Sequence, residues 1–224
     1  LFSGTGAAAT SEFEKFKVAI KTATGVDGSK IGWDGVKLDG TDANPNTKII
    51  VPGKTVEIPV DRFKNLGVIF ADPYSVSGDG FVSVNPESFG QFPAFSPNNT
   101  FAMFDPNEGQ FEDRIIQQVF VLPNTLNEAG SRGFGAIFLD TELYSSSIEY
   151  FGKDAAGNKI SLGKYYVKPG ADKEPQFLGV LFDAPVISEI EITVGSKALF
   201  NFNGTTFNSF GSEDLAKNVD LVVT

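Results

Sequence analysis

Three short strings of nearly the same sequence constrain the fold most: GVIFADP at 67–73, GAIFLDT at 135–141 and GVLFDAP at 179–185. In each string a glycine precedes a run of consecutive apolar residues. A half-buried antiparallel strand alternates apolar and polar residues, so these unbroken runs predict strands that are covered on both faces. The unequal spacings and unlike flanks argue against an internal repeat. We therefore predict three central strands that meet the same packing constraint.

An aspartate follows each apolar run, at Asp72, Asp140 and Asp183. Aspartate accepts hydrogen bonds from nearby backbone amides and often starts a turn, so these residues indicate the ends of strands. The alternative is that the three carboxylates converge on one rim of the fold and bind a cation.

Most of the remaining chain also reads as short strands, which are separated by turns rich in Asn, Asp, Pro and Gly. Strands and helices do not alternate regularly, which disfavours a parallel α/β sheet. We predict an all-β fold, a jelly-roll-like antiparallel β-sandwich of two sheets, as a single domain over residues 1–224. The further strands are expected at 47–51, 55–60, 80–84, 115–122, 147–152, 160–167 and 187–195.

One short helix is predicted near the N-terminus, at about residues 11–22. Ser11 can cap its first turn and Glu14 stands three residues later, which is the pattern of a capping box. Gly25 is expected to end the helix. The apolar face, which we expect to pack on a sheet, consists of Phe13, Phe16 and Ile20.

The longest stretch without any periodicity covers about residues 85–113 and is rich in Phe and Pro. We expect it to form an ordered loop that lies over the sandwich. The alternative is a linker between two lobes. We favour the loop because a sheet built from either half alone would expose apolar faces.

Composition excludes several classes of function. The net charge is −10, which argues against binding to nucleic acid and to anionic membranes. The chain has no cysteine and no histidine, so the common zinc ligands and the usual catalytic-triad base are missing. No apolar run approaches the length of a membrane span, so no direct membrane insertion is expected. We also expect no organic cofactor.

Three blocks of sequence resemble a known group of proteins. They are FEKFKVAI with IGWDGV, GDGFVSVNP with FSPNNTFAMF, and the long block from SRGFGAIFLDTELYSSSIEYFG to FLGVLFDAPVISEIEITVG. Together they resemble uncharacterised exported bacterial proteins, many of which carry a PEP-CTERM sorting tail. The resemblance implies an exported, jelly-roll-like β-sandwich and carries over no site residues. We therefore expect an extracellular or cell-surface location, with a signal peptide and an anchor already removed.

Acidic loops suggest a structural calcium ion, because hard cations prefer several oxygen ligands from one loop. The segment DGVKLDGTDANPN offers Asp34, Asp39 and Asp42, and Asp140 is a fourth candidate ligand. A second acidic segment, at 105–108, offers further oxygen atoms. Neither segment has the spacing of an EF-hand, and a solvated acidic loop is the alternative interpretation.

Carbohydrate binding is the leading functional hypothesis. Sugar-binding sandwiches place an exposed aromatic ring against a pyranose and hold its hydroxyls with polar side chains. The candidate ligand-binding residues are Trp33 with its neighbour Asp34, and Tyr74. The alternative for the lone tryptophan is a place in the core.

Catalysis has less support from the sequence. Asp140 and Glu142 could form the carboxylate pair of a glycosidase, but no other motif accompanies them. We therefore predict an exported, non-catalytic module that binds surface or matrix polysaccharide, with or without calcium. The alternatives are a self-associating component of a cell envelope or biofilm, and a glycan-cleaving enzyme without histidine.

Overall fold

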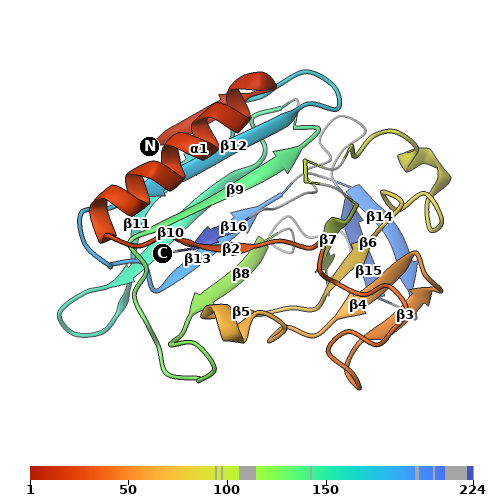
Figure 1. Cartoon of the computed structure of the whole chain (residues 1–224), viewed down its shortest axis with the longest axis horizontal. Coiled ribbons are helices and arrows are strands. Elements are labelled where there is room, and N and C mark those ends of the chain that lie inside the picture. Colours follow the sequence, from red (N-terminus) through yellow and green to blue (C-terminus); the bar gives the residue numbers. More distant parts are fainter. Residues whose placement is uncertain are drawn as a thin grey trace.

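The structure is a computed structural model that describes residues 1–93, 95–96, 98–105, 115–141, 143–194, 197–203, 205–209 and 221–223. This part of the chain is mostly β-strand, in three antiparallel sheets, with one α-helix, α1 (Ala7–Thr24) (Figure 1). The predicted all-β sandwich is confirmed. A third sheet adds to the two that we predicted. Within the described residues, no helix is both long enough and apolar enough to cross a membrane.

The first sheet, here called the helix-side sheet, lies directly beneath α1. Its five strands stand in the order β1-β12-β9-β16-β2. Helix α1 contacts β1, β12 and β9, so it covers one half of this sheet. The strand bounds are β1 (Phe2–Thr5), β12 (Pro175–Leu181), β9 (Gly133–Leu139), β16 (Leu221–Val223) and β2 (Ser29–Ile31).

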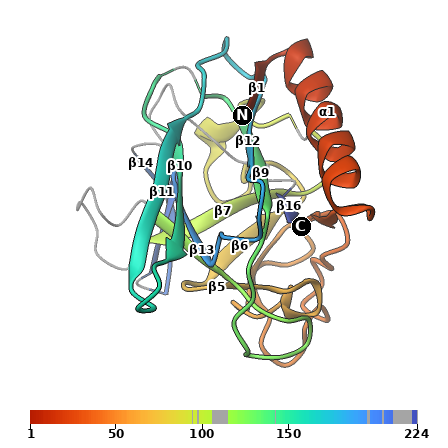
Figure 2. The same cartoon turned by 90° about the vertical axis from the view of Figure 1, so that its left-hand side faces the viewer.

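The second sheet, here called the outer sheet, packs on the other face of the helix-side sheet. Figure 2 shows the resulting layers, with α1 on one side, β9 and β12 in the middle, and β10 and β11 on the far side. The strand order is β11-β10-β13-β8-β5. The strand bounds are β11 (Lys159–Tyr166), β10 (Ser147–Lys153), β13 (Glu189–Thr193), β8 (Ile115–Phe120) and β5 (Val68–Phe70).

The third sheet lies at the end of the molecule away from α1 (Figure 1). Its six strands stand in the order β14-β15-β7-β6-β4-β3. The strand bounds are β14 (Lys197–Phe202), β15 (Thr205–Ser209), β7 (Thr100–Asp105), β6 (Tyr74–Ser77), β4 (Thr55–Ile58) and β3 (Lys48–Val51).

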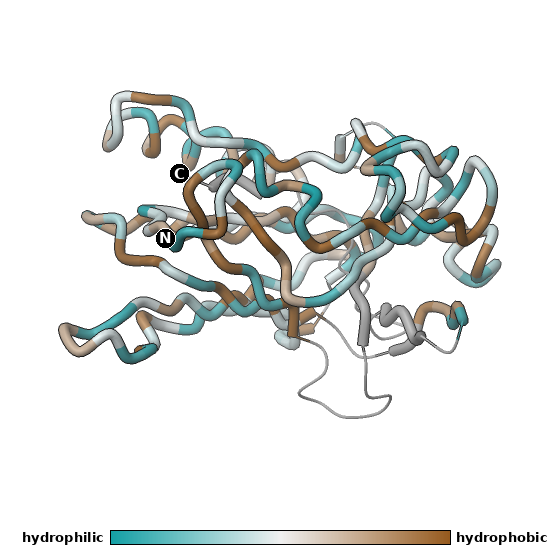
Figure 3. Tube along the Cα trace, turned by 90° about the horizontal axis from the view of Figure 1, so that it is seen from below, coloured by the Kyte–Doolittle hydropathy of each residue, from teal (hydrophilic) through white to brown (hydrophobic). Residues whose placement is uncertain are grey.

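One apolar cluster joins the three sheets. It includes Phe134 of the helix-side sheet, Tyr150 of the outer sheet and Val76 of the third sheet, all of them inaccessible to solvent. In Figure 3 the longest apolar stretches run through the middle of the molecule. Burial of this apolar surface is the main force that holds the layers together.

The three similar strings form two kinds of strand, two in the interior of a sheet and one at an edge. Strands β9 and β12 lie inside the helix-side sheet and are covered on both faces, as predicted, except that Leu181 at the end of β12 is half-buried. In β9, Ile137 packs under α1, whereas Phe138 joins the shared core. The run in β5 lies at the edge of the outer sheet, where Ile69 is only half-buried. The prediction of a central strand is therefore wrong for β5.

The glycines that open the runs in β9 and β12 are cross-strand partners. Gly135 pairs with Gly179 in the register of the two strands. A Cβ atom at Gly179 would lie 2.7 Å from Cζ of Phe177, and one at Gly135 would lie 2.9 Å from the same atom. The two missing side chains therefore make room for the Phe177 ring. Phe16 of α1 packs on that ring, with the two centroids 5.6 Å apart.

The glycine of the first string, Gly67, has a different structural role. Gly67 ends a short 3₁₀ helix, η1 (Lys64–Leu66), in the left-handed backbone conformation, with φ at 82°. A Cβ atom there would lie 2.7 Å from the carbonyl oxygen of Val121. Glycine is therefore required by the turn and not by the packing of a helix.

The helix is longer than predicted and begins earlier. It starts at Ala7, directly after Gly6, whose φ of 55° turns the chain sharply out of β1. The alanines that follow have a high helix propensity, so the helix begins before Ser11. The hydroxyl of Ser11 donates to the carbonyl of Ala8 instead of capping the first turn. The predicted end at Gly25 is confirmed, since its N–H donates to the carbonyl of Lys21.

Two further predictions need correction. Residues 80–84 form a turn and not a strand, because Gly80 and Phe81 both have positive φ, which interrupts an extended chain. The stretch at 85–113 is not one loop, since it contains the 3₁₀ helix η2 (Pro86–Ser88) and strand β7 of the third sheet. Residues 106–113 lie outside the described part of the chain.

The glycine pair yields a stability prediction. Gly179→Ala should lower the free energy of unfolding by about 1–3 kcal/mol, because the new methyl group would overlap the Phe177 ring. Gly35→Ala is the matched control: Gly35 is exposed and has no atom within 4 Å of its Cβ position. Urea unfolding followed by circular dichroism measures both. Equal stability of the two variants would contradict the proposed packing role.

The β10–β11 hairpin yields a pH prediction. The carboxylate of Asp154 accepts hydrogen bonds from the N–H groups of Asn158 and Ala156, both at 2.8 Å. The Asn158 side chain, and then its backbone, lower the pKa of Asp154 from 3.8. This contribution to stability is therefore present above the ordinary pKa and is lost as pH falls through the lowered value.

The free energies of unfolding of the wild type and Asp154→Asn should thus begin to converge below about pH 4 and should meet only below the lowered pKa of Asp154, where the native carboxylate becomes protonated. NMR titration of the Asp154 carboxyl carbon measures the pKa directly. A stability difference that stays constant down to pH 2 would show that the carboxylate charge does not support the turn.

Candidate functional site

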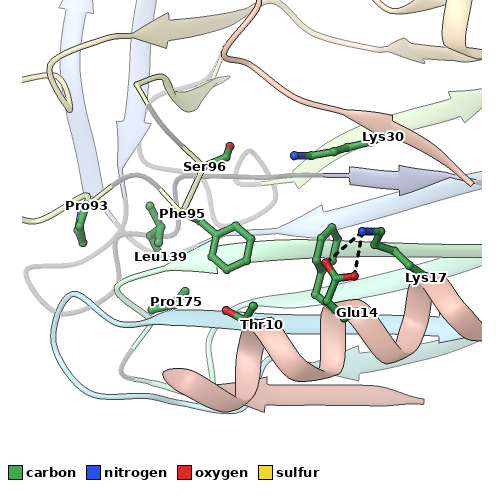
Figure 4. Close-up of a pocket in the computed structure, with 10 residues that line it drawn as sticks. Thr10, Glu14, Lys17, Lys30, Pro93, Phe95, Ser96, Leu139 and Pro175 are labelled. Carbon is green, nitrogen blue, oxygen red and sulfur yellow. Dashed lines mark hydrogen bonds and ion pairs between the residues drawn. The ribbon is translucent and has the colours of Figure 1, made fainter.

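A cleft opens between α1, β2 and the segment that follows η2 (Figure 4). Its volume is about 500 Å³, which is within the range of small-molecule sites, roughly 300–1,000 Å³. Side chains from five separate parts of the chain line it. They are Thr10, Phe13, Glu14, Lys17, Lys30, Pro93, Phe95, Ser96, Leu139 and Pro175.

Helix α1 provides one wall. Thr10, Phe13, Glu14 and Lys17 are spaced by three and four residues, so they form one stripe along the helix. Phe13 is buried at the edge of the apolar face, whereas the other three side chains are exposed. The stripe is thus the boundary between the buried and the solvated faces of the helix, and it presents an apolar edge beside polar groups.

The floor and the opposite wall are apolar. Leu139 and Pro175 are register partners, at the end of β9 and the start of β12. The half-buried Phe95 meets Phe13 edge to face, with the two ring centroids 6.0 Å apart. Phe13 in turn packs on Phe177, with the centroids 5.5 Å apart. The ring that faces the cleft is therefore supported by the same aromatic layer that holds α1 on the sheet.

Charged groups stand on the rim. The Lys17 ammonium lies 3.0 Å from both carboxylate oxygens of Glu14 and 5.3 Å from the centre of the Phe13 ring. Lys30 comes from β2, and Figure 4 shows its side chain extending across the cleft toward Ser96. The cleft thus combines an aromatic wall with donors and acceptors. It is suited to a ligand that has one apolar face and several polar groups.

The predicted ligand-binding rings do not line this cleft. Trp33 and Tyr74 are each 1% exposed, so neither can offer a face to a ligand. Trp33 stacks on Phe101, with the ring centroids 4.5 Å apart, and it meets Tyr74 edge to face at 5.1 Å. Burial raises the pKa of Tyr74 well above its usual value. The prediction of exposed rings is wrong, and the alternative, that Trp33 is a core residue, is confirmed.

The predicted calcium ligands of the first acidic loop are each engaged by protein groups. The Asp34 carboxylate accepts from the Asn99 N–H at 3.1 Å, and Asp39 accepts from Thr41. Asp42 forms an ion pair with Arg62 at 2.8 Å. In the part of the chain that the structure describes, no three acidic side chains come close enough to hold a metal ion. Calcium binding stays a prediction.

The aspartates of the three strings lie in different environments. Asp140 is 1% exposed and accepts from the Lys173 N–H at 2.7 Å, whereas Asp183 is exposed. Asp72 is intermediate, and burial raises its pKa. They do not form a three-carboxylate group within the described chain. Glu142 and residues 106–108 lie outside the described residues, so the paired-carboxylate hypothesis stays a prediction.

A second depression, of about 460 Å³, is lined by Asp42, Ala43, Asp61, Arg62, Lys64, Asn65 and Asn124. Its charges pair with one another, as Arg62 with Asp42 and Lys64 with Asp61 at 3.6 Å. The described lining has no aromatic side chain. It therefore lacks the apolar wall that distinguishes the cleft beside α1.

The exposed face of the outer sheet is also a weaker candidate. It carries the exposed Tyr166 on β11 and the Phe151 ring on β10, and the Phe151 ring is covered by the Lys159 ammonium at 3.9 Å from the ring centre. Lys159 also pairs with Glu189 and Glu191, each at 2.7 Å. The Phe151 ring therefore has no open face, and Tyr166 has no cleft around it among those described above.

Comparison with known proteins assigns no family. No family model matches the chain, and no characterised protein matches its sequence. The resemblance to exported PEP-CTERM-associated proteins therefore stays a prediction. Two solved structures have a low similarity to this fold. Their TM-scores and sequence identities are too low to indicate a function for this chain.

The first is the enzymatically active domain of tailspike protein 4 of bacteriophage CBA120, with a TM-score of 0.32 and 12% identity. The match covers 70% of this chain but only 19% of that one. The second is TmCBM61 in complex with β-1,4-galactotriose, with a TM-score of 0.29 and 16% identity. That match covers 67% of this chain and 87% of the other.

Sequence reasoning missed the cleft because its walls meet only in the folded chain. The stripe from Thr10 to Lys17 could have been identified as the polar edge of the predicted helix. The approach of Lys30 and Phe95 to that stripe depends on tertiary packing and has no local pattern. The described exposed aromatic rings were missed as well. They are Phe89, Tyr144 and Tyr166.

The burial of the only tryptophan yields a test. Emission from Trp33 should be blue-shifted and should resist quenching by iodide until the protein unfolds, because the indole is 1% exposed. Fluorescence with increasing iodide, in buffer and in 6 M guanidinium chloride, measures this. Strong quenching of the native protein would restore the prediction that Trp33 faces solvent.

Proposed function

We propose that this chain is a non-catalytic carbohydrate-binding module and that the cleft beside α1 is its binding site. The observation that carries the proposal is the pairing of an aromatic wall with a polar rim in one cleft of suitable size. A fold alone does not define a function, so the proposal depends on the chemistry of this site.

The chemistry of the cleft matches that of a sugar. A pyranose has an apolar face of C–H groups and a rim of hydroxyls. The C–H face can pack on Phe95 and the floor formed by Leu139 and Pro175. The hydroxyls can bond to Thr10 and Ser96, which both donate and accept hydrogen bonds.

The support for Phe95 also favours binding. Phe95 is held by Phe13, which is itself packed on Phe177 in the helix-side sheet. A ring that is fixed before the ligand arrives loses less conformational entropy on binding. The wall of the cleft is thus pre-organised by the core of the fold.

The setting of the module is part of the proposal. We propose that the chain is exported and binds polysaccharide at the cell surface or in the surrounding matrix. The absence of cysteine and histidine from the sequence fits a site that works by shape and hydrogen bonding. A calcium requirement can be tested in the same binding assays by adding a chelator.

The test is binding to a glycan array by the wild type and Phe95→Ala. Removal of the ring should weaken binding about tenfold, because the apolar contact with the sugar is lost. Tyr166→Ala is the matched control, since Tyr166 is exposed on β11, on the side of the molecule away from α1 (Figure 2).

The outcomes separate the site from the function. Loss of binding in Phe95→Ala alone, with unchanged thermal stability, would support the cleft. Loss of glycan binding in Tyr166→Ala alone would indicate that the binding site lies on the outer sheet and not in the cleft. Silence of the wild type on the whole array would overturn the proposed function.

A further inference from the structure

One phenylalanine of this chain faces solvent. Phe89 is 79% exposed, whereas the other phenylalanines whose exposure the structure describes are buried or half-buried. A phenyl ring has no polar atom, so its contact with water costs free energy. Single exposed apolar side chains are nevertheless common on protein surfaces. The position of Phe89 and the way its backbone is held therefore decide whether the ring can serve a ligand.

The turn that carries Phe89 is fixed on both sides. Phe89 directly follows η2, which Asn85 caps. The side chain of Asn85 also donates to the carbonyl of Leu199 in β14 at 3.1 Å. Ser88 is 2% exposed, and its hydroxyl donates to the carbonyl of Gly80 at 2.8 Å. These bonds hold the backbone beside a ring that points to solvent.

Phe89 lies close to the cleft along the chain. It precedes Pro93, which lines the cleft, by four residues, so the two Cα atoms lie at most about 14 Å apart. The turn shortens this span, since the N–H of Gln91 donates to the carbonyl of Ser88 at 3.0 Å. The exposed ring of Phe89 and the aromatic wall at Phe95 therefore belong to one short segment.

We infer that the binding site continues from the cleft to Phe89, so that its ligand is an oligosaccharide chain and not a single sugar residue. This inference rests on the proposed function and specifies the length of the ligand. One sugar residue lies against Phe95 in the cleft, and a later residue of the same chain places its apolar C–H face on the Phe89 ring. The contact buries apolar surface of both partners.

Polar side chains flank the exposed ring. Glu87 is exposed and Gln91 is half-buried, and they stand two residues before and two residues after Phe89. A carboxylate accepts hydrogen bonds from hydroxyls, and an amide both donates and accepts them. The surroundings of Phe89 thus repeat the chemistry of the cleft, in which an aromatic ring stands beside hydrogen-bonding groups.

A sugar residue fits this ring better than a protein partner does. Protein interfaces of standard size bury about 800 Å² on each partner and have an apolar centre. Phe89 is followed by Gly90, which has no side chain, and Glu87 is charged. The apolar area is therefore small, and it matches the face of one sugar residue.

The experiment measures how affinity depends on the length of the sugar chain. Calorimetry uses the cello-, xylo-, manno- and malto-oligosaccharides, each from the disaccharide to the hexasaccharide. Phe89→Ala should bind the hexasaccharide of the recognised series about tenfold more weakly than the wild type does, because the contact with the second ring is lost. The same variant should bind the disaccharide as the wild type does.

Three variants serve as controls. Phe89→Trp keeps a flat ring and should retain the affinity for long chains. Tyr166→Ala removes an exposed ring from the side of the molecule away from α1 and should leave every length unchanged. Phe95→Ala should weaken binding at every length, because it removes the wall of the cleft.

The outcomes separate this inference from the proposed function. Equal affinity of the wild type and Phe89→Ala for the hexasaccharide, or an equal loss at every length, would overturn the extended site. The proposed function would still stand if Phe95→Ala weakened binding. A wild type that binds no member of any series would overturn both.

Discussion

The docking of α1 on the helix-side sheet depends on one arrangement, the Phe177 ring lying over two facing glycines. Glycine is the only residue type that leaves space for the ring at positions 135 and 179, since a Cβ atom at either position would lie within 3 Å of the Phe177 ring. The ring fills the space and presents its other atoms to Phe13 and Phe16. The helix therefore sits at a distance and a rotation that the sheet defines.

The position of the cleft follows from that rotation. Because Phe13 faces Phe177, the residues next to it on the helix surface, Thr10, Glu14 and Lys17, stand at the border of the sheet. Beyond this border β2 brings Lys30, and Phe95 closes the remaining side by packing on Phe13. A substitution that shifts the helix would thus alter the site without touching it, so stability and binding should change together at the glycine pair.

Much of the fold could be predicted from the sequence because local patterns determine it. Unbroken apolar runs indicated that β9 and β12 are covered on both faces, and Gly25 indicated the end of α1. The same pattern failed for β5, because an edge strand beside a turn glycine gives a similar string. The short strands of the third sheet, such as β6, lack such runs, and they depend on partners distant in sequence.

The candidate site could be predicted only in kind. The sequence predicted a site with an aromatic ring beside polar groups. It assigned the ring to Trp33 or Tyr74, but both side chains are buried in the core. Both rings are surrounded by phenylalanines in the core. Burial of their large apolar surfaces lowers the free energy of the folded protein more than exposure at a binding site would. A ring can serve a ligand only where neighbouring layers stop short of covering it. That condition is met at Phe95, which lies beside Phe13 of the helix stripe and is only half-buried, and it depends on how the layers pack and not on the residue type.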